Sequence, residues 1–367
     1  MTRGRFAPSP TGRMHLGNVF CALLSWLSAK SKGGEWVLRI EDLDPQRSKK
    51  DYALQLMDDL QWLDLPWDGE PVWQSQRGEI YEGYLQRLTD MGLTYPCYCT
   101  RADIMATQAP HETDGRVVYK GTCRPSTPSP LTPHPSPLTA TTRLIVPDCT
   151  IPFTDGHYGK HDINLAEHCG DYIIRRKDGA WAYQLAVVVD DALMGVTEIV
   201  RGRDLLLSSP QQIHLRSLLF QSTDDRVQST ENRVQMTDGL LKRKTITDAS
   251  VPTTTSFTPQ TVPLRQGDER SGGGGLTAHR SSLNVQHSTL NFFHHPLLCN
   301  AEGQRLCKRD KSMDLGYLRG TGITPQEIIG KLAYLAGLTD TTTPITPSEL
   351  LPLFSWKKVP TEDIILK

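Results

Sequence analysis

Three cysteines are close enough in the sequence to bind a metal together. Cys97 and Cys99 are one residue apart in YPCYC, and Cys123 follows in YKGTC. Thiolates are good zinc ligands, and a structural zinc site has four ligands arranged as a tetrahedron. Histidine is the usual fourth ligand, and His111 is available. The alternative is three buried apolar thiols, which is the commoner state of free cysteine, but the C-x-C spacing favours a metal.

A second group of candidate residues lies in RFAPSPTGRMHLGN, residues 5–18. His15 and Gly17 precede a segment, 19–29, whose apolar residues recur at helical spacing. A glycine at a helix start lets a ligand approach the backbone, and the exposed N–H groups there favour phosphate. We expect His15 to donate to the same phosphates. For an isolated H-x-G, an ordinary turn with a surface histidine would be the better interpretation.

Acidic residues follow the first predicted interior strand. Residues 36–40 (WVLRI) are apolar enough for such a strand, and EDLD, residues 41–44, comes directly after it. Ligands of open α/β sheets bind at the carboxyl ends of the strands. The carboxylates that begin with Glu41 therefore predict a binding site at this edge.

Further elements must position these residues. The patterns predict helices at about 51–63 and 80–91, buried strands or a strand–helix mix over 181–202, a helix with Ser209 as its N-cap and Pro210 after it, and a capped helix from about Thr324. Residues 126–142, rich in Pro, Ser and Thr, are expected to form an exposed loop. Residues 221–290 carry too little apolar surface to fold, and we expect a disordered insertion.

Composition limits the class of protein. The 367 residues fit about two domains, and 40 Lys and Arg nearly balance 41 Asp and Glu. Any nucleic-acid partner must therefore meet a local basic patch, because there is no global positive field. No stretch approaches the roughly 18 apolar residues of a membrane span, so we expect a cytoplasmic protein without a membrane partner. The eight cysteines are scattered apart from the cluster at 97–123, which in a reducing compartment argues against a disulfide framework.

The motifs together resemble those of class I glutamyl-tRNA synthetases. The stretch RFAPSPTGRMHLG resembles their nucleotide-binding signature, with Asn18 where the family has the last histidine of His-x-Gly-His. Four more motifs follow in the same order, in residues 39–47, 181–191, 199–205 and 305–310. The resemblance implies an α/β fold: a Rossmann-like class I catalytic domain with a parallel sheet, a zinc-bearing insertion and a short helical C-terminal region.

The resemblance also implies roles for single residues. Arg5 and Arg201 would face the carboxylates of glutamate, Glu41 would face its amino group, and Tyr183 would close the pocket. Other expected glutamate-site residues are Phe6, Ala7, Pro8 and Ser9, and the expected ATP-site residues are His15, Gly17, Asn18 and Lys308. The signature that resembles His-x-Gly-His covers Pro8, Ser9, Pro10, Thr11, Gly12, Arg13, Met14, His15, Leu16, Gly17 and Asn18.

The last motif corresponds to the family's Lys-Met-Ser-Lys-Ser loop, which holds ATP during activation. It consists here of Arg305, Leu306, Cys307, Lys308 and Arg309. Only Lys308 keeps the family's residue among the Lys and Ser positions, so we expect it to meet the triphosphate as a mobile point charge. Cys307 removes a hydroxyl donor from the loop.

Truncated relatives, the glutamyl-queuosine tRNA(Asp) synthetases, show C-x-C followed by Y-x-x-x-C. Tyr119 and Cys123 reproduce the second spacing. The resemblance therefore favours Cys97, Cys99, Tyr119 and Cys123 as ligands of one structural Zn²⁺, with His111 in reserve.

Only a helix or two are expected after the Lys308 motif, which leaves no room for an anticodon-binding domain and again resembles the truncated relatives. The resemblance implies that glutamate is activated by ATP with Mg²⁺, without tRNA, and is then transferred to queuosine in the anticodon stem-loop of tRNA(Asp) by a monomer. One alternative is a short synthetase that charges the 3′ end of tRNA(Glu). Another is a catalytically silent paralogue that binds glutamate or tRNA.

The expected organisation divides the chain into five segments. Residues 1–92 and 171–220 would be the two halves of the catalytic domain, and 93–170 the zinc-binding and connecting insertion. Residues 221–290 would be the disordered insertion, and 291–367 the ATP loop and helical C-terminal region.

Overall fold

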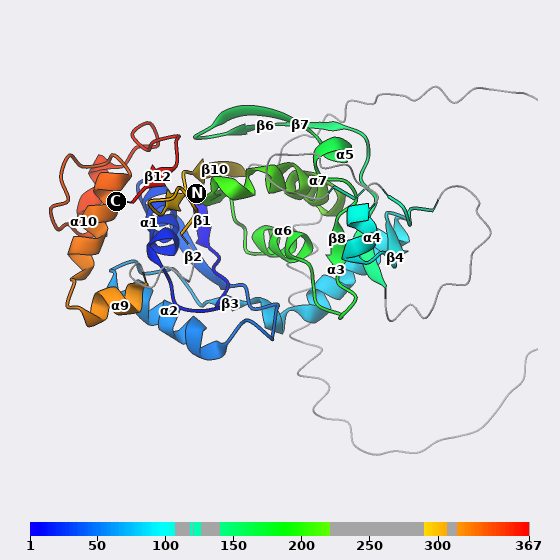
Figure 1. Ribbon diagram of the computed structural model, residues 1–367, viewed down its shortest axis with the longest axis horizontal. Coiled ribbons are helices and arrows are strands. Elements are labelled where there is room, and N and C mark those ends of the chain that lie inside the picture. Colours follow the sequence, from blue (N-terminus) through cyan, green and yellow to red (C-terminus); the bar gives the residue numbers. More distant parts are fainter. Residues whose placement is uncertain (107–117, 120, 126–139, 221–289, 307–313, 367) are drawn as a thin grey trace, which may run out of the picture. The chain divides into compact units, whose positions relative to one another are not determined.

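The computed structural model describes residues 1–106, 118–119, 121–125, 140–220, 290–306 and 314–366 (Figure 1). Its main sheet has seven strands in the order β3-β2-β1-β9-β10-β6-β7. The strands are β1 Arg3–Phe6, β2 Glu35–Ile40, β3 Val72–Trp73, β6 Thr150–Asp155, β7 Gly159–Asn164, β9 Glu198–Gly202 and β10 Asn291–His295. All neighbours pair in parallel except β6 and β7, which are antiparallel. The expected α/β class with a parallel sheet is confirmed, apart from β7 at its edge.

Helices cover the sheet. Helix α1, Leu16–Lys30, packs on β1, β2 and β9, whereas α6, Tyr183–Leu193, packs with α7, Ser209–Leu219, and α3, Gly78–Asp90 (Figure 1). The remaining α-helices of the described residues are α2 Lys50–Trp62, α4 Arg101–Ala106, α5 Leu165–His168, α9 Leu315–Gly320, α10 Pro325–Leu335 and α11 Pro347–Leu350. One large hydrophobic core surrounds α1, and a second surrounds α3, α6 and α7.

Alternation along the strands separates apolar from charged side chains. In β1, β2 and β9, the side chains of Phe6, Leu38 and Val200 belong to the core around α1. Successive side chains of a strand point to opposite faces, so the neighbouring positions face α6 and α7. These positions carry Arg5, Arg39 and Arg201, and β10 adds His294. The face toward α1 is therefore mainly apolar, with Glu198 and His295 as buried polar exceptions, and the other face carries a row of buried charged and polar groups.

A second, antiparallel sheet of three strands carries the first cysteine. It consists of β4 Thr94–Cys97, β5 Thr141–Leu144 and β8 Ile173–Arg175. The predicted loop over 126–142 is wrong at its end, since Thr141 and Thr142 pair within β5, and residues 126–139 lie outside the described residues. Strands β6 and β7, although inside the range 93–170, join the main sheet, and the segment boundaries stay predictions.

Most of the predicted helices and strands are present. The mix expected over 181–202 is helix α6 followed by strand β9. Thr324 caps α10 through a capping box with Glu327. Helix α7 begins at Ser209 as expected, but Ser208 is its N-cap residue, and the Ser209 hydroxyl accepts a hydrogen bond from Arg201 instead of capping the helix. Of the predicted insertion 221–290, only Leu290 lies within the described residues.

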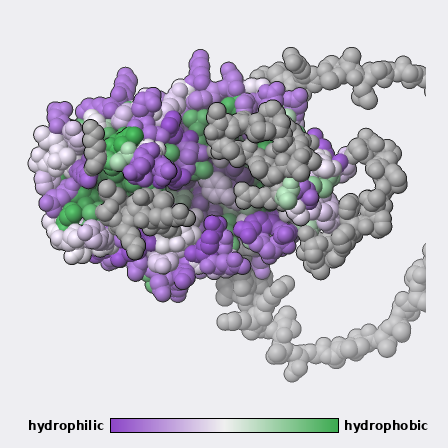
Figure 2. All heavy atoms as spheres, in the orientation of Figure 1, coloured by the Kyte–Doolittle hydropathy of each residue, from purple (hydrophilic) through white to green (hydrophobic). Residues whose placement is uncertain are grey.

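The described residues include no helix long and apolar enough to cross a membrane. Hydrophilic side chains predominate over the described part of the face drawn in Figure 2, and small hydrophobic groups lie toward the end that holds α10. A third, two-stranded sheet, β11 Leu298–Cys299 with β12 Ile364–Ile365, joins the last residues of the described chain to the segment after β10.

Candidate active site

A cavity of about 470 Å³ opens at the carboxyl ends of β1, β2 and β9, beside the start of α1. The chain passes from β1 to β2 on one side, and β9 pairs with β1 on the other. A parallel sheet binds ligands at such a reversal of strand order. The predicted residues that line the cavity are Arg5, Phe6, Ala7, Pro8, Ser9, Thr11, Gly12, Arg13, Met14, His15, Gly17, Asn18, Glu41, Tyr183, Arg201, Arg305 and Leu306.

The remaining predicted residues lie elsewhere or outside the described residues. Pro10 and Leu16 are buried away from the cavity. Cys307, Lys308 and Arg309 lie outside the described residues. The segments that flank them are nevertheless held at the cavity. The backbone N–H of Leu306 donates to the Leu298 carbonyl over 2.9 Å, and the backbone N–H of Leu315 donates to the Met14 carbonyl over 2.9 Å.

Arg39 is fully buried at the centre of the charged face. Its Nη1 donates to Asp191 Oδ1 over 2.5 Å, and its Nη2 donates to Glu41 Oε1 over 3.0 Å. Arg5 reaches the same Asp191 oxygen from 3.4 Å. Burial raises the pKa of Glu41, although Arg39 opposes the shift. Burial also disfavours the charge of Asp191, but the charges of Arg39 and Arg5 outweigh it and lower the pKa of that carboxyl.

Arg201 is tethered by three side chains. Its Nη1 donates to Gln212 over 2.8 Å, its Nη2 donates to Ser209 over 2.8 Å, and its Nε donates to His294 over 3.0 Å. Burial lowers the pKa of Arg201, but a guanidinium stays protonated in proteins. The arginine is therefore a fixed positive charge, 4 % exposed, at the cavity wall.

His15 is the N-cap residue of α1. The ring Nδ1 of His15 accepts a hydrogen bond from the backbone N–H of Gly17 over 3.1 Å. The backbone N–H of His15 donates to Asn18 Oδ1 over 3.1 Å. Nδ1 therefore cannot donate to phosphate, so the expected donation is restricted to Nε2. A Cβ at Gly17 would lie 2.9 Å from His15 Cε1, so any other residue here would displace the His15 ring from its capping position. Asn18, where the sequence departs from His-x-Gly-His, completes the capping box.

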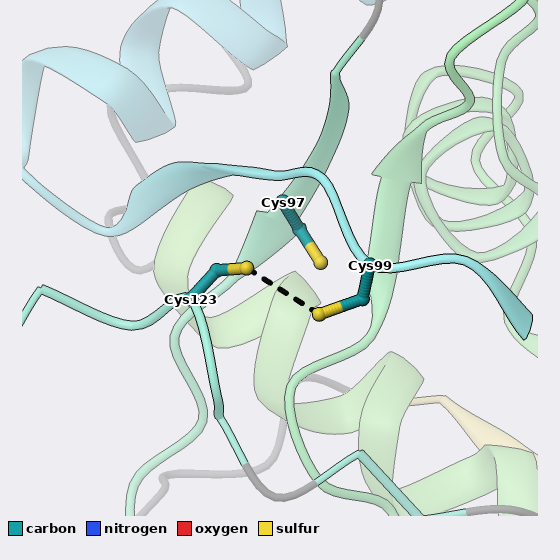
Figure 3. A group of neighbouring side chains, drawn as sticks. All are labelled: Cys97, Cys99 and Cys123. Carbon is teal, nitrogen blue, oxygen red and sulfur yellow. Dashed lines mark hydrogen bonds between the residues drawn. The ribbon is translucent and has the colours of Figure 1, made fainter. Parts of the chain in front are cut away.

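The cysteine group is assembled as the spacing predicts. Figure 3 shows the sulfur atoms of Cys97, Cys99 and Cys123 turned toward one another, and all three lie within 4.8 Å. The hydroxyl of Tyr119 lies 3.4 Å from Cys97 Sγ and 3.6 Å from Cys99 Sγ. Three thiols and a phenol oxygen thus converge at separations that fit a tetrahedral ion about 2.3 Å from each sulfur. His111 lies outside the described residues.

Hydrogen bonds bias one thiol of this group toward the thiolate. Burial disfavours the charge of Cys123, but bonding to Tyr119 and to the other thiols lowers the pKa of Cys123 to about 7. The Tyr119 hydroxyl also accepts the backbone N–H of Cys123 over 2.7 Å. Zinc binds the thiolate form of cysteine, so this environment suits a metal.

Several residues of the site were not assigned from the sequence. Asp191 balances Arg5 and Arg39, while His294 and Gln212 hold Arg201. Two signals were present: the carboxylate pair at the end of the apolar run 185–191, and the tandem histidines after FF in residues 292–295. Neither pattern predicts which arginine the residue contacts, because that arginine is distant in the sequence.

Comparisons with known proteins identify the class. Residues 1–253 match the family described as tRNA synthetases class I (E and Q), catalytic domain. The crystal structure of a glutamate tRNA ligase from Elizabethkingia meningosepticum, in complex with its amino acid, superimposes with a TM-score of 0.67 and 22% identity, over 100% of this chain and 67% of that chain. At this identity the match shows the fold, which is that of a class I tRNA synthetase catalytic domain.

Curated relatives narrow the class. The Glutamyl-Q tRNA(Asp) synthetase of Symbiobacterium thermophilum is 37% identical over 99% of this chain and 95% of its own length, and that of Nitratidesulfovibrio vulgaris is 35% identical over 100% and 95%. That of Neisseria meningitidis serogroup C is 48% identical over 60% of this chain and 72% of its own. The chain belongs to the glutamyl-Q tRNA(Asp) synthetase family, and it is a ligase-type enzyme.

Proposed function

We propose that this protein activates glutamate with ATP, without tRNA, and transfers the glutamyl group to queuosine in the anticodon of tRNA(Asp). The observation that carries the proposal is that Arg5, Arg201 and Glu41 line one cavity, whereas the other two arginines of its lining, Arg13 and Arg305, are paired with Asp59 and Asp204. Glutamate has two carboxylates and one ammonium, so two cations and one anion match its charges. Guanidinium groups suit carboxylates because they can donate two parallel hydrogen bonds.

Activation is an in-line displacement at the α-phosphate of ATP. A carboxylate oxygen of glutamate forms the new bond to phosphorus, and pyrophosphate leaves with the electron pair of the broken bond. The attacking carboxylate is already ionised, so no general base is needed. Positioning and neutralisation of charge supply the acceleration. The charge of Lys308 and the Nε2 of His15 would hold the phosphates, because the N–H groups of Gly17 and Asn18 already donate to His15, and Mg²⁺ would accompany ATP.

Transfer needs a nucleoside hydroxyl beside the activated carboxyl. A second hollow of about 300 Å³ shares Ser9, Glu41 and Tyr183 with the cavity, and Trp181 and Arg176 line its outer part. Trp181 offers an aromatic surface for a splayed base, and Arg176, which is paired with Asp178 and lies 3.7 Å from Asp44, offers a guanidinium for its phosphate. This supports queuosine as the acceptor, whose hydroxyl would attack the glutamyl carbonyl and release AMP.

The metal would be structural. One Zn²⁺ held by Cys97, Cys99, Tyr119 and Cys123 has no open position for a substrate, and it would supply cross-linking of β4 to the segment around Cys123. We also propose that the protein acts as a monomer in the cytoplasm.

The acceptor assay tests the function. Purified protein is incubated with ATP, labelled glutamate and one of three RNAs: tRNA(Asp) with queuosine, tRNA(Asp) from cells that lack queuosine, and tRNA(Glu). Label on the first RNA alone is expected. Label on the 3′ end of tRNA(Glu) would favour the short synthetase. Absence of glutamate-dependent exchange between pyrophosphate and ATP would favour the silent paralogue.

A further inference from the structure

A hydrogen-bonded chain runs across three adjacent strands behind the cavity. Asp155 ends β6, His294 lies on β10, and Arg201 on β9 is the direct register partner of His294. His294 Nδ1 lies 2.7 Å from Asp155 Oδ2, and its Nε2 accepts from Arg201 Nε over 3.0 Å. The exposed fractions are 2 % for Asp155, 0 % for His294 and 4 % for Arg201.

The hydrogen-bond donors and acceptors determine where the protons lie between Arg201, His294 and Asp155. A guanidinium only donates, so Nε2 of His294 must present its lone pair to Arg201. In a neutral ring the single proton then sits on Nδ1, where it is donated to Asp155. Burial lowers the pKa of His294 to about 4, so the ring is neutral near pH 7. Asp155 is itself held by the backbone N–H groups of His157 and Tyr158, over 3.0 and 2.9 Å.

We propose that His294, oriented by Asp155, positions Arg201 for a carboxylate of the amino-acid substrate. The proposal rests on the proposed function, which assigns that carboxylate to Arg201. His294 does not line the cavity, whereas Arg201 does, so His294 is a positioning residue. Its bond to Nε adds a third tether to those from Gln212 and Ser209, and three tethers define the plane of the guanidinium. A fixed guanidinium loses less rotamer entropy when substrate binds.

A neutral acceptor also preserves the charge of Arg201. A carboxylate in direct contact would form an ion pair and compete with the substrate, and no carboxylate oxygen is among the three side-chain acceptors that tether Arg201. The imidazole of His294 places one ring between Arg201 and the Asp155 carboxylate. Arg201 thereby stays the stronger attractor for a substrate carboxylate.

Kinetics of pyrophosphate–ATP exchange test the proposal. His294→Phe removes both ring nitrogens, and Asp155→Asn lets the amide donate to Nδ1, which would place a proton on Nε2 against Arg201. Both changes are expected to raise KM for glutamate roughly tenfold or more, the effect of a lost hydrogen bond to a charged group, with KM for ATP unchanged. Asn291→Ala is the control, since Asn291 is exposed at the start of the same strand, β10, and its side chain bonds to the Thr197 carbonyl; it should leave both constants unchanged.

The unaltered protein offers a second readout that does not depend on a variant's folding. ¹⁵N NMR of labelled histidine should show a neutral ring protonated on Nδ1 for His294 and another for His295, whose Nδ1 donates to the Pro296 carbonyl over 2.8 Å. Only the His294 signal should disappear in His294→Phe. A signal from His294 protonated on Nε2 would overturn the proposal, as would unchanged KM for glutamate in both folded variants. Arg201→Gln distinguishes failure of the proposed function from failure of the inference about His294. If Arg201→Gln leaves KM for glutamate unchanged, Arg201 does not bind the substrate carboxylate. If KM rises in Arg201→Gln but not in the His294 and Asp155 variants, only the positioning role of His294 is refuted.

Discussion

Arg39 and Glu41 lie two residues apart on the same face of the sheet, and Arg39 Nη2 donates to Glu41 Oε1 over 3.0 Å. The same guanidinium donates to Asp191 on α6 over 2.5 Å. Arg39 therefore compensates two carboxylates that burial would otherwise destabilise. It also holds one of them, Glu41, at the wall of the cavity.

Removal of Arg39 should destabilise the fold. Arg39→Met leaves Asp191 and Glu41 without their shared cation, and a broken buried ion pair costs about 3–5 kcal/mol of unfolding free energy. Urea denaturation measures the loss. Arg47→Met is the control, because Arg47 is 74 % exposed in its pair with Asp44 and should cost no more than about 1 kcal/mol. Equal stability of the two variants would contradict the central role of Arg39.

Glutamate affinity should weaken in acid earlier than an ordinary carboxyl would predict. Burial raises the pKa of Glu41, so protonation removes its charge at a higher pH than usual. The dissociation constant for glutamate, measured by calorimetry over a series of pH values, should rise as the pH falls toward that raised pKa. Glu41→Gln should bind weakly throughout and lose this dependence.

The raised pKa of Glu41 affects the stability of the fold in the opposite direction from glutamate affinity. A carboxyl whose pKa is higher in the folded than in the unfolded state stabilises the fold fully at low pH, and that contribution is lost as the pH rises through the folded pKa. Above that pH, Glu41→Gln should therefore be at least as stable as the unaltered chain. A large loss of stability in Glu41→Gln at neutral pH would show that the bond to Arg39 outweighs desolvation.

Lys308 should be required for activation. Lys308→Ala removes the cation expected to stabilise charge on the phosphates, and loss of such a group lowers kcat by about 10²–10³. The exchange between pyrophosphate and ATP should fall accordingly, with unfolding unaffected. Lys331→Ala, which changes an exposed lysine of α10, should retain full exchange. Undiminished exchange in Lys308→Ala would disprove the assignment.

Zinc content should depend on the cysteine group. The unaltered protein is expected to carry about one zinc per chain, measured by mass spectrometry of the metal, and Cys123→Ser should lose most of it because a thiolate ligand is removed. Tyr119→Phe tests the fourth ligand: reduced zinc supports Tyr119, and full retention favours another donor such as His111. Cys149→Ser changes a thiol outside the group and should keep the metal.

Local patterns were sufficient for the elements and for most of the cavity's residues. Helix and strand periods are short-range properties, which is why α1, β2 and α10 lie where their spacing predicts. Motif order placed Arg5, Glu41, Tyr183 and Arg201 in one site, and all four line one cavity. The expected end of the 126–142 loop was wrong because pairing of Thr141 with Cys97 across β5 and β4 outweighs local composition.

The sequence by itself determined which residues we expect to carry the chemistry of this protein, because residue type and spacing are written along the chain. Only the tertiary structure decided which hydrogen bonds hold each of these side chains. It shows that His15 Nδ1 accepts a hydrogen bond rather than donating one, and that Arg201 donates to His294. The Arg201–His294 pair is separated by 93 positions and the Asp155–His294 pair by 139. Hydrogen bonds depend on distance in space, so contacts of this range are made only when the strands are brought together in the sheet.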